Sequence, residues 1–223
     1  MGQLLYYFIL FVFIGRHLLD HPWLLGSVVV LYLLRGRLPD PWVYFRTAGR
    51  IRSLRIQIAQ NADNAIARRD LAMVWLERRR PRRAIVLLEE ARRRDPESAE
   101  LSFLLALAYV RVGREEDALP LLVDAQQRDP KLRYGEVYLV AGVALAALGR
   151  DAEAEDALLR FLKINASSVE GWVRLARLRR RQKDEEGAKA ALLGAVEAFD
   201  QSPKFRRRRE LGWYVRAQLA RVL

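Results

Sequence analysis

Cysteine is absent from this 223-residue sequence, and histidine occurs only twice. Without thiols the chain can form neither disulfides nor thiolate metal sites, and it has no cysteine to which a lipid could be attached. His17 and His21 could present two ring nitrogens to a metal, but Asp20 between them is the only third ligand nearby. We therefore expect no metal and no cofactor, and we interpret these residues as a polar cluster between two apolar runs.

Motifs that carry catalysis are also missing. The sequence has no phosphate-binding Gly-Lys loop, no nucleophile elbow and no His-Glu-x-x-His helix. We therefore expect that this protein is not an enzyme.

Lysine is scarce, because 34 of the 39 basic residues are arginine. With 27 acidic residues the formal net charge is +12. Such a balance suggests phosphate, anionic lipid or acidic protein as a partner, but it does not choose among them. The bias toward arginine and alanine is also typical of GC-rich bacterial genomes, which weakens a functional interpretation of the charge.

No apolar run reaches the roughly 20 residues that a helix needs to cross a bilayer. Two shorter runs, residues 4–14 and 23–34, are separated by a polar cluster that ends at Pro22. They predict a membrane anchor over residues 1–37, either a re-entrant hairpin or one kinked transmembrane helix. We favour the hairpin because proline breaks helical hydrogen bonding. The alternative is an apolar N-terminal helix that docks on a partner protein.

Arginines dominate the segment after the second apolar run, and Asp40 is the only acid among them. The positive-inside rule then predicts that all later residues lie on the cytoplasmic side, in a bacterial inner membrane. Residues 38–63 are predicted to contain a basic juxtamembrane amphipathic helix, with Trp42, Phe45, Leu54 and Ile58 near one face. It could lie on anionic lipid or cover the domain that follows. Its predicted membrane-surface residues are Trp42, Arg46, Arg50 and Arg52.

The remaining sequence repeats itself. A set of landmark residues is followed by similar residues 34 positions later, from Leu105-Ala106 to Asp129-Pro130. The first members of this set are Leu71-Ala72, Trp75, Ala84, Leu88, Ala91 and Asp95-Pro96. A third copy is shifted by 36 residues, with a two-residue insertion near Lys131–Gly135, and a fourth follows at 34. Small residues recur where two helices would approach closely, and these are Ala84, Ala118, Ala154 and Ala188. Gly113 and Gly149 end first helices, where a left-handed residue is needed.

This pattern resembles the tetratricopeptide-repeat family, whose unit is a 34-residue helix–turn–helix. The resemblance implies an all-α fold, a right-handed α-solenoid over residues 64–203. Its four repeats would span about 65–98, 99–132, 135–168 and 169–202. The sequence departs from the family pattern where Arg179 replaces an aromatic residue and where Asn165-Ala166 replaces Asp-Pro. Residues 204–223 are predicted to form a capping helix, with one apolar stripe of Leu211, Val215, Leu219 and Val222 covering the last repeat.

In this family the first helices line a concave groove that binds a partner. The resemblance therefore implies a groove that is apolar in its middle and basic at its far end. Its predicted residues are Arg69, Met73, Phe103, Leu107, Arg111, Val143, Arg174, Arg177 and Arg181. Such a groove suits a peptide or amphipathic helix with apolar anchors and an acidic segment.

Three hypotheses about function follow. The first is a membrane-tethered scaffold or adaptor whose cytoplasmic repeats bind a protein. The second has the same architecture with the repeats in the periplasm, as an assembly factor or chaperone of an envelope complex. The third is nucleic-acid binding, which the basic charge permits but which the lack of aromatic residues among the arginine clusters disfavours.

Overall fold

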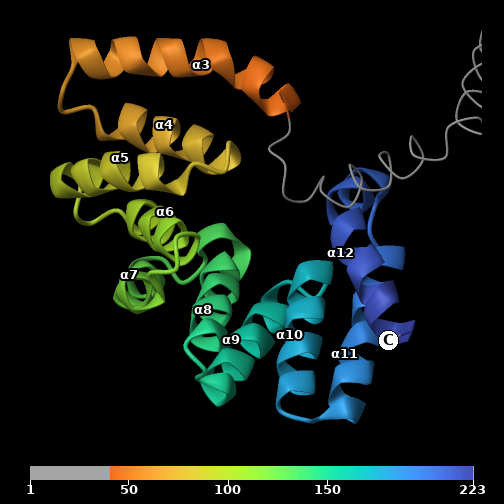
Figure 1. The fold of residues 1–223 in the computed structure, drawn as a ribbon. Coiled ribbons are helices and arrows are strands. Elements are labelled where there is room, and N and C mark those ends of the chain that lie inside the picture. Colours follow the sequence, from red (N-terminus) through yellow and green to blue (C-terminus); the bar gives the residue numbers. More distant parts are fainter. Residues whose placement is uncertain (1–40, 223) are drawn as a thin grey trace, which may run out of the picture. The chain divides into compact units, whose positions relative to one another are not determined.

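The computed structural model describes residues 41–222 (Figure 1). These residues form helices joined by turns, without a β-strand among them, which confirms the predicted all-α class. The chain divides into two compact units, Met1–Gly49 and Arg50–Leu223. The predicted anchor over residues 1–37 lies outside the described residues. Between residues 41 and 222, no helix combines the length and the apolar character that a membrane crossing requires.

Helix α3, Pro41–Gln60, belongs to both units. In the first unit the Thr47 hydroxyl donates a hydrogen bond of 2.5 Å to the Val43 carbonyl, one helical turn earlier. In the second unit Ile51 and Leu54 are buried in the same core cluster as Leu71. Residues 50–60 therefore cover the first repeat, which is one of the two roles expected for this segment.

Phe45 does not share the buried face of α3, contrary to the prediction, and its side chain is 78% exposed. The reason is helical geometry. Phe45 precedes Leu54 by nine residues, and at 3.6 residues per turn they lie about half a turn apart around the helix.

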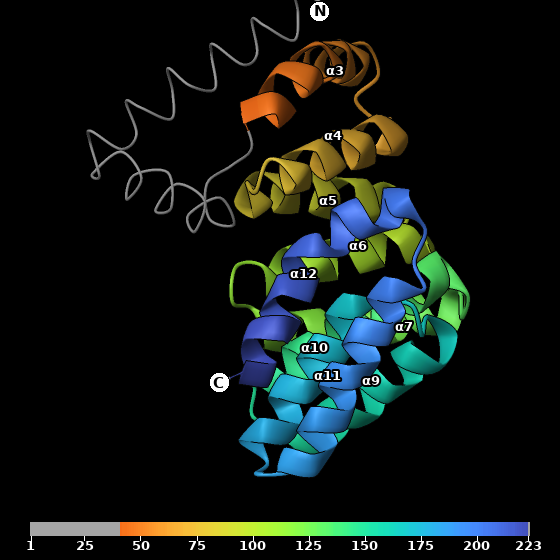
Figure 2. The ribbon, with the colours of Figure 1, turned by 90° about the vertical axis from the view of Figure 1, so that its right-hand side faces the viewer.

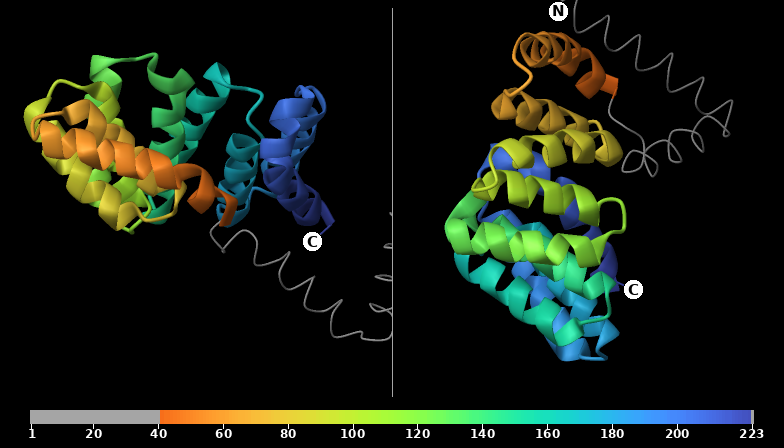
Figure 3. Two further views of the ribbon diagram at one scale, coloured as in Figure 1. Left: turned by 90° about the horizontal axis from the view of Figure 1, so that it is seen from above. Right: turned by 90° about the vertical axis from the view of Figure 1, so that its left-hand side faces the viewer.

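Four antiparallel helix pairs make up most of the second unit, and they follow one another along a curved path (Figures 1 and 3). Each first helix packs on its own second helix, and each second helix packs on the next first helix. The prediction of an α-solenoid is thereby confirmed. The pairs are α4 Ala65–Glu77 with α5 Pro81–Arg94, α6 Ala99–Val110 with α7 Glu115–Arg128, α8 Glu136–Ala147 with α9 Asp151–Ile164, and α10 Val169–Arg181 with α11 Glu185–Asp200.

Small residues allow the helices of this stack to approach closely. The four alanines at equivalent positions of the second helices, Ala84, Ala118, Ala154 and Ala188, are at most 1% exposed. Gly142 plays a similar part on α8, because a Cβ there would lie 2.8 Å from Cγ of Leu158. A larger side chain at such positions would push adjacent helices apart.

The turns between first and second helices all use a left-handed residue at the same repeat position. Gly113 and Gly149 occupy it with φ of +79° and +76°. Arg79 and Lys183 occupy it in the first and fourth repeats with φ of +55° and +65°. Glycine enters this conformation without the steric cost that a Cβ imposes, so the turns at Arg79 and Lys183 are more strained than the other two.

The insertion between the second and third repeats forms the short 3-10 helix η1, Leu132–Gly135. Arg133, Tyr134 and Gly135 all have positive φ values there, which turns the chain sharply before α8 begins. Gly135 is buried, and a Cβ on it would lie 2.9 Å from Cδ1 of Ile164. The turn is thus fixed against the end of α9.

Helix α12, Lys204–Val222, packs on α10 and α11 and ends the stack (Figure 2). The predicted apolar stripe does not make this contact. Leu211, Val215 and Leu219 are 48%, 37% and 58% exposed, and the side chain of Val222 lies outside the described side chains. Ala217 is instead fully buried, and Trp213, Tyr214 and Ala220 pack beside it. The helix is rotated relative to the prediction, because alanine lets it approach closer to its neighbours than leucine would.

Candidate partner-binding groove

Helices α6, α8 and α10, the first helices of three consecutive repeats, share one face of the stack. A cavity of about 390 Å³ lies on this face, and every residue that lines it belongs to these helices or their ends. From the predicted groove it includes Phe103, Leu107, Arg111, Val143 and Arg174. The structure therefore brings five of the nine predicted residues together at one site.

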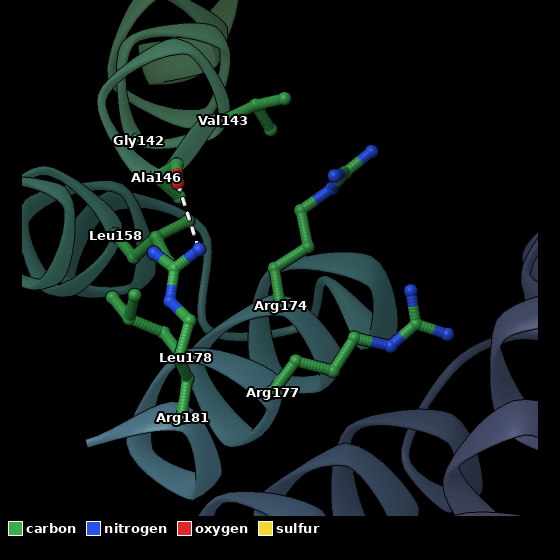
Figure 4. Close-up of a pocket in the computed structure, with 8 residues that line it drawn as sticks. All are labelled: Gly142, Val143, Ala146, Leu158, Arg174, Arg177, Leu178 and Arg181. Atoms are coloured by element: carbon green, nitrogen blue, oxygen red, sulfur yellow. Dashed lines mark hydrogen bonds between the residues drawn. The ribbon is translucent and has the colours of Figure 1, made fainter. Parts of the chain in front are cut away.

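A second cavity of about 180 Å³ continues the first, because Val143 and Arg174 line both. Its walls carry Arg177 and Arg181, and its floor is formed by apolar residues of α8, α9 and α10, including Leu158 and Leu178 (Figure 4). The two cavities form one groove that is mostly apolar along α8 and mostly basic along α10, with Glu136 and Glu170 as the acids in its lining.

The arginines at the basic end differ in how their charges are neutralised. Arg181 is paired with Asp151 and donates a hydrogen bond of 2.8 Å to the Ala146 carbonyl. Arg174 is paired with Glu170 at 2.6 Å. Arg177 has no ion pair with any acid of residues 41–222, and its side chain is exposed.

The repeats are similar to those of known proteins. Residues 76–134 match the family described as Tetratricopeptide repeat. This segment carries the tetratricopeptide repeat. No curated protein sequence matches it significantly.

Solved structures share the fold of this chain. TTC0263, a thermophilic TPR protein in Thermus thermophilus, is 24% identical with a TM-score of 0.64, over 82% of this chain and 94% of that one. MamA is 19% identical with a TM-score of 0.62, over 70% of this chain and 92% of that one. At these identities the likeness concerns the fold alone.

Trp213 of α12 joins the basic end of the groove. Three guanidinium groups lie over its ring, those of Arg174, Arg177 and Arg216, at 5.0, 5.9 and 4.4 Å from the ring centroid. The ring faces attract cations, so the indole holds three positive charges close together.

Desolvation and neighbouring cations both act on Arg177. Desolvation by the surrounding protein lowers the pKa of its guanidinium, and the charges of Arg216 and Arg174 lower it further. Burial, and then the charge of Arg79, likewise lower the pKa of Arg111, whose guanidinium donates a hydrogen bond of 2.9 Å to the Leu76 carbonyl. A carboxylate placed beside Arg177 or Arg111 would stabilise the charged form of that guanidinium.

Phe103, predicted as a contact residue, forms the floor of the groove and is only 1% exposed. The guanidinium of Arg133 lies 5.4 Å from the centroid of its ring, and Arg133 also forms an ion pair of 2.5 Å with Glu100. Almost none of the Phe103 side chain is therefore open to a partner. Phe103 therefore supports the groove from within the core.

Arg69 and Met73 of α4 lie away from the two cavities. Arg69 is paired with Asp70 at 2.9 Å, and Met73 packs against the core and accepts a 3.7 Å contact from Arg133. Of the predicted membrane-surface residues, Arg46, Arg50 and Arg52 are exposed on α3, and Trp42 lies in its first turn with a side chain outside the described ones.

Sequence reasoning missed Arg133, Trp213 and Arg216. The two-residue insertion could have pointed to Arg133, because extra residues at a repeat junction must leave the regular path. Trp213 could have been found from its spacing to Ala217 and Ala220, which puts an aromatic residue and two small residues on one face of a helix.

Proposed function

We propose that this protein is a membrane-tethered scaffold that binds an acidic segment of a protein partner in the groove between α6, α8 and α10. The observation that supports it most is the juxtaposition of an apolar floor with Arg177, a cation without an acidic partner among the described residues. Apolar floors bind side-chain anchors, and an unneutralised guanidinium favours a carboxylate.

The shape of the groove suggests how a partner would lie. It runs across three helices of successive repeats, from Leu107 past Val143 to Arg177. A peptide placed along it would set apolar side chains against α8 and acidic side chains beside α10. An amphipathic helix or an extended chain with this order of residues fits equally well.

Membrane tethering is the second part of the proposal, and sequence supports it. Residues 1–37 are rich in apolar residues and are followed by arginines, the pattern of an anchor with a cytoplasmic flank. Protease treatment of intact spheroplasts tests the orientation, with the repeats expected to resist digestion. Cleavage from outside would instead favour a periplasmic assembly factor or chaperone.

Site-specific photocrosslinking in the cell tests the groove. A photoreactive amino acid at Val143, in the groove, is compared with one at Val123, a 55% exposed residue of the second helix α7. We expect a protein adduct from Val143 that disappears with Arg177→Glu. The matched control is Lys189→Glu, which reverses an exposed charge on α11.

Three outcomes would contradict the groove assignment. An adduct from Val123 but not from Val143 would place the partner on the outer helices. An adduct that persists in Arg177→Glu would mean that the basic end is not used. A nucleic-acid adduct from Val143 would show that the groove binds nucleic acid and not a protein.

A further inference from the structure

The outward side of α12 combines exposed apolar residues with arginine and lysine. Phe205, Leu211, Val215 and Leu219 are 74%, 48%, 37% and 58% exposed. At about 100° per residue, these four side chains fall within about a third of the helix circumference. Lys204, Arg208, Arg209 and Arg216 are exposed on the same side. We call these eight residues the α12 face.

Acidic residues are missing from the α12 face. The only acid of the helix is Glu210, which is half-buried on the opposite side. Arg208 and Arg209 lie next to the apolar residues, and long basic side chains beside exposed leucines are the pattern of a helix that lies in a membrane interface.

The α12 face is one side of a single helix, and this helps to identify what covers it. Within residues 50–222, α12 packs on α10 and α11 with its other side, and the apolar residues of this face are exposed. Its apolar residues extend over about 21 Å along one helix, from Phe205 to Leu219, without a neighbouring wall that would form a pocket. A broad, flat partner suits such a surface better than a peptide does.

A second copy of the chain is a poor partner for this face. Two α12 helices packed against each other would bring the cations of both copies together without a single acid between them. An anionic bilayer instead supplies both interactions, because its acyl boundary accepts the apolar residues and its headgroups neutralise the cations.

We propose that the α12 face binds the surface of an anionic lipid bilayer. The walls of the groove lie on α6, α8, α9 and α10, and the α12 face shares only Arg216 with its basic end, where this guanidinium lies over Trp213. The lipid contact does not rest on the N-terminal anchor. If both contacts exist, the repeat unit is held to the membrane at two points.

Because the chain lacks cysteine, a single introduced thiol can report on this contact in the full-length protein. Leu219→Cys carries an environment-sensitive fluorophore on the α12 face. Leu193→Cys carries it on α11, where the native leucine is 49% exposed, as the matched control. Each labelled protein is mixed with vesicles of phosphatidylcholine alone or of equal parts phosphatidylcholine and phosphatidylglycerol.

We expect the probe at position 219 to shift to the blue and to resist aqueous quenchers only with the anionic vesicles. Adding Arg208→Glu and Arg209→Glu should raise the lipid concentration needed for this shift at least about tenfold. Both side chains are exposed, so these changes should leave the circular dichroism unchanged. The probe at position 193 should stay in water throughout.

The proposal is wrong if the probe at position 219 stays in water on anionic vesicles, or if it shifts equally on neutral ones. Protection of this probe by an acidic protein rather than by vesicles would also overturn it. Arg177→Glu separates the two proposals, because it should abolish groove binding and leave the probe signal unchanged.

Discussion

Individual residues set the strain in the turns of the repeats. Lys183 holds a left-handed conformation that glycine adopts at Gly113 and Gly149. We expect Lys183→Gly to raise the free energy of unfolding by about 0.5–1 kcal/mol, because the steric cost of the Cβ disappears while some unfolded-state entropy is added. Urea unfolding followed by circular dichroism measures this. Lys183→Ala removes the charge but keeps the Cβ, and it should give no gain; a destabilised Lys183→Gly variant would contradict the left-handed turn.

Asp124 joins the first two repeats through a hydrogen-bond network. It accepts hydrogen bonds of 2.6 Å from the Ser102 hydroxyl and from Arg128, and Arg92 of the first repeat lies 3.6 Å away. Burial would raise the pKa of the carboxyl, but the hydrogen bonds from Ser102 and Arg128 and the charges of Arg128 and Arg92 bring it below its ordinary value.

Because the pKa of Asp124 is lowered in the folded state, the ionised network stabilises the fold at pH values above the ordinary pKa of 3.8. This stabilisation is lost as the pH falls through the lowered pKa of the folded state. Asp124→Asn should therefore cost about 1–2 kcal/mol near neutral pH and less at about pH 3. Unfolding free energies of wild type and variant at both pH values test this. An equal difference at the two pH values would show that the carboxylate charge is not responsible.

At the scale of helices, a very close contact involves Gly171 of α10. A Cβ at this position would lie 2.8 Å from Cε1 of Phe161 and 2.9 Å from Cδ2 of Leu162, and Phe161 is itself buried. Gly171→Ala should therefore destabilise the junction of the third and fourth repeats by about 1–3 kcal/mol.

Gly212 provides the matched control for this change. It lies inside α12, and no other atom comes within 4 Å of the position that a Cβ would take, so Gly212→Ala should stabilise the helix by about 0.5–1 kcal/mol. Thermal unfolding of the two variants measures both effects. If both alanines destabilise the protein to the same degree, the close packing of α9 against α10 is not the cause.

The helices show where prediction from sequence succeeded and where it did not. Recurring alanines such as Ala84 and Ala118 predicted the stack, because close helix approach requires small residues and the periodicity displays them directly. The same argument applied to Ala217 and Ala220 would have predicted the buried side of α12. The prediction instead placed the leucine and valine side of this helix against the last repeat. Because α12 has apolar residues on both sides, its sequence alone does not show which side packs.

At the scale of the whole repeat unit, the position of the groove followed from the order of first helices, but its individual contacts did not. Leu107, Val143 and Arg174 line it as expected. Phe103 is covered by Arg133, whose place depends on three consecutive left-handed residues after an insertion. Trp213 enters from a helix outside the repeat pattern. Such details depend on tertiary packing, which the spacing of small residues does not encode.

The affinity of the partner captured from the groove tests the central proposal most directly. Full-length wild type, Arg177→Glu and Lys189→Glu are titrated with this partner at physiological salt. We predict at least a tenfold loss for Arg177→Glu, about 1.4 kcal/mol, and no change for Lys189→Glu. Equal affinities for all three proteins, or an equal loss in both variants, would contradict a groove that recognises its partner through the basic end of α10.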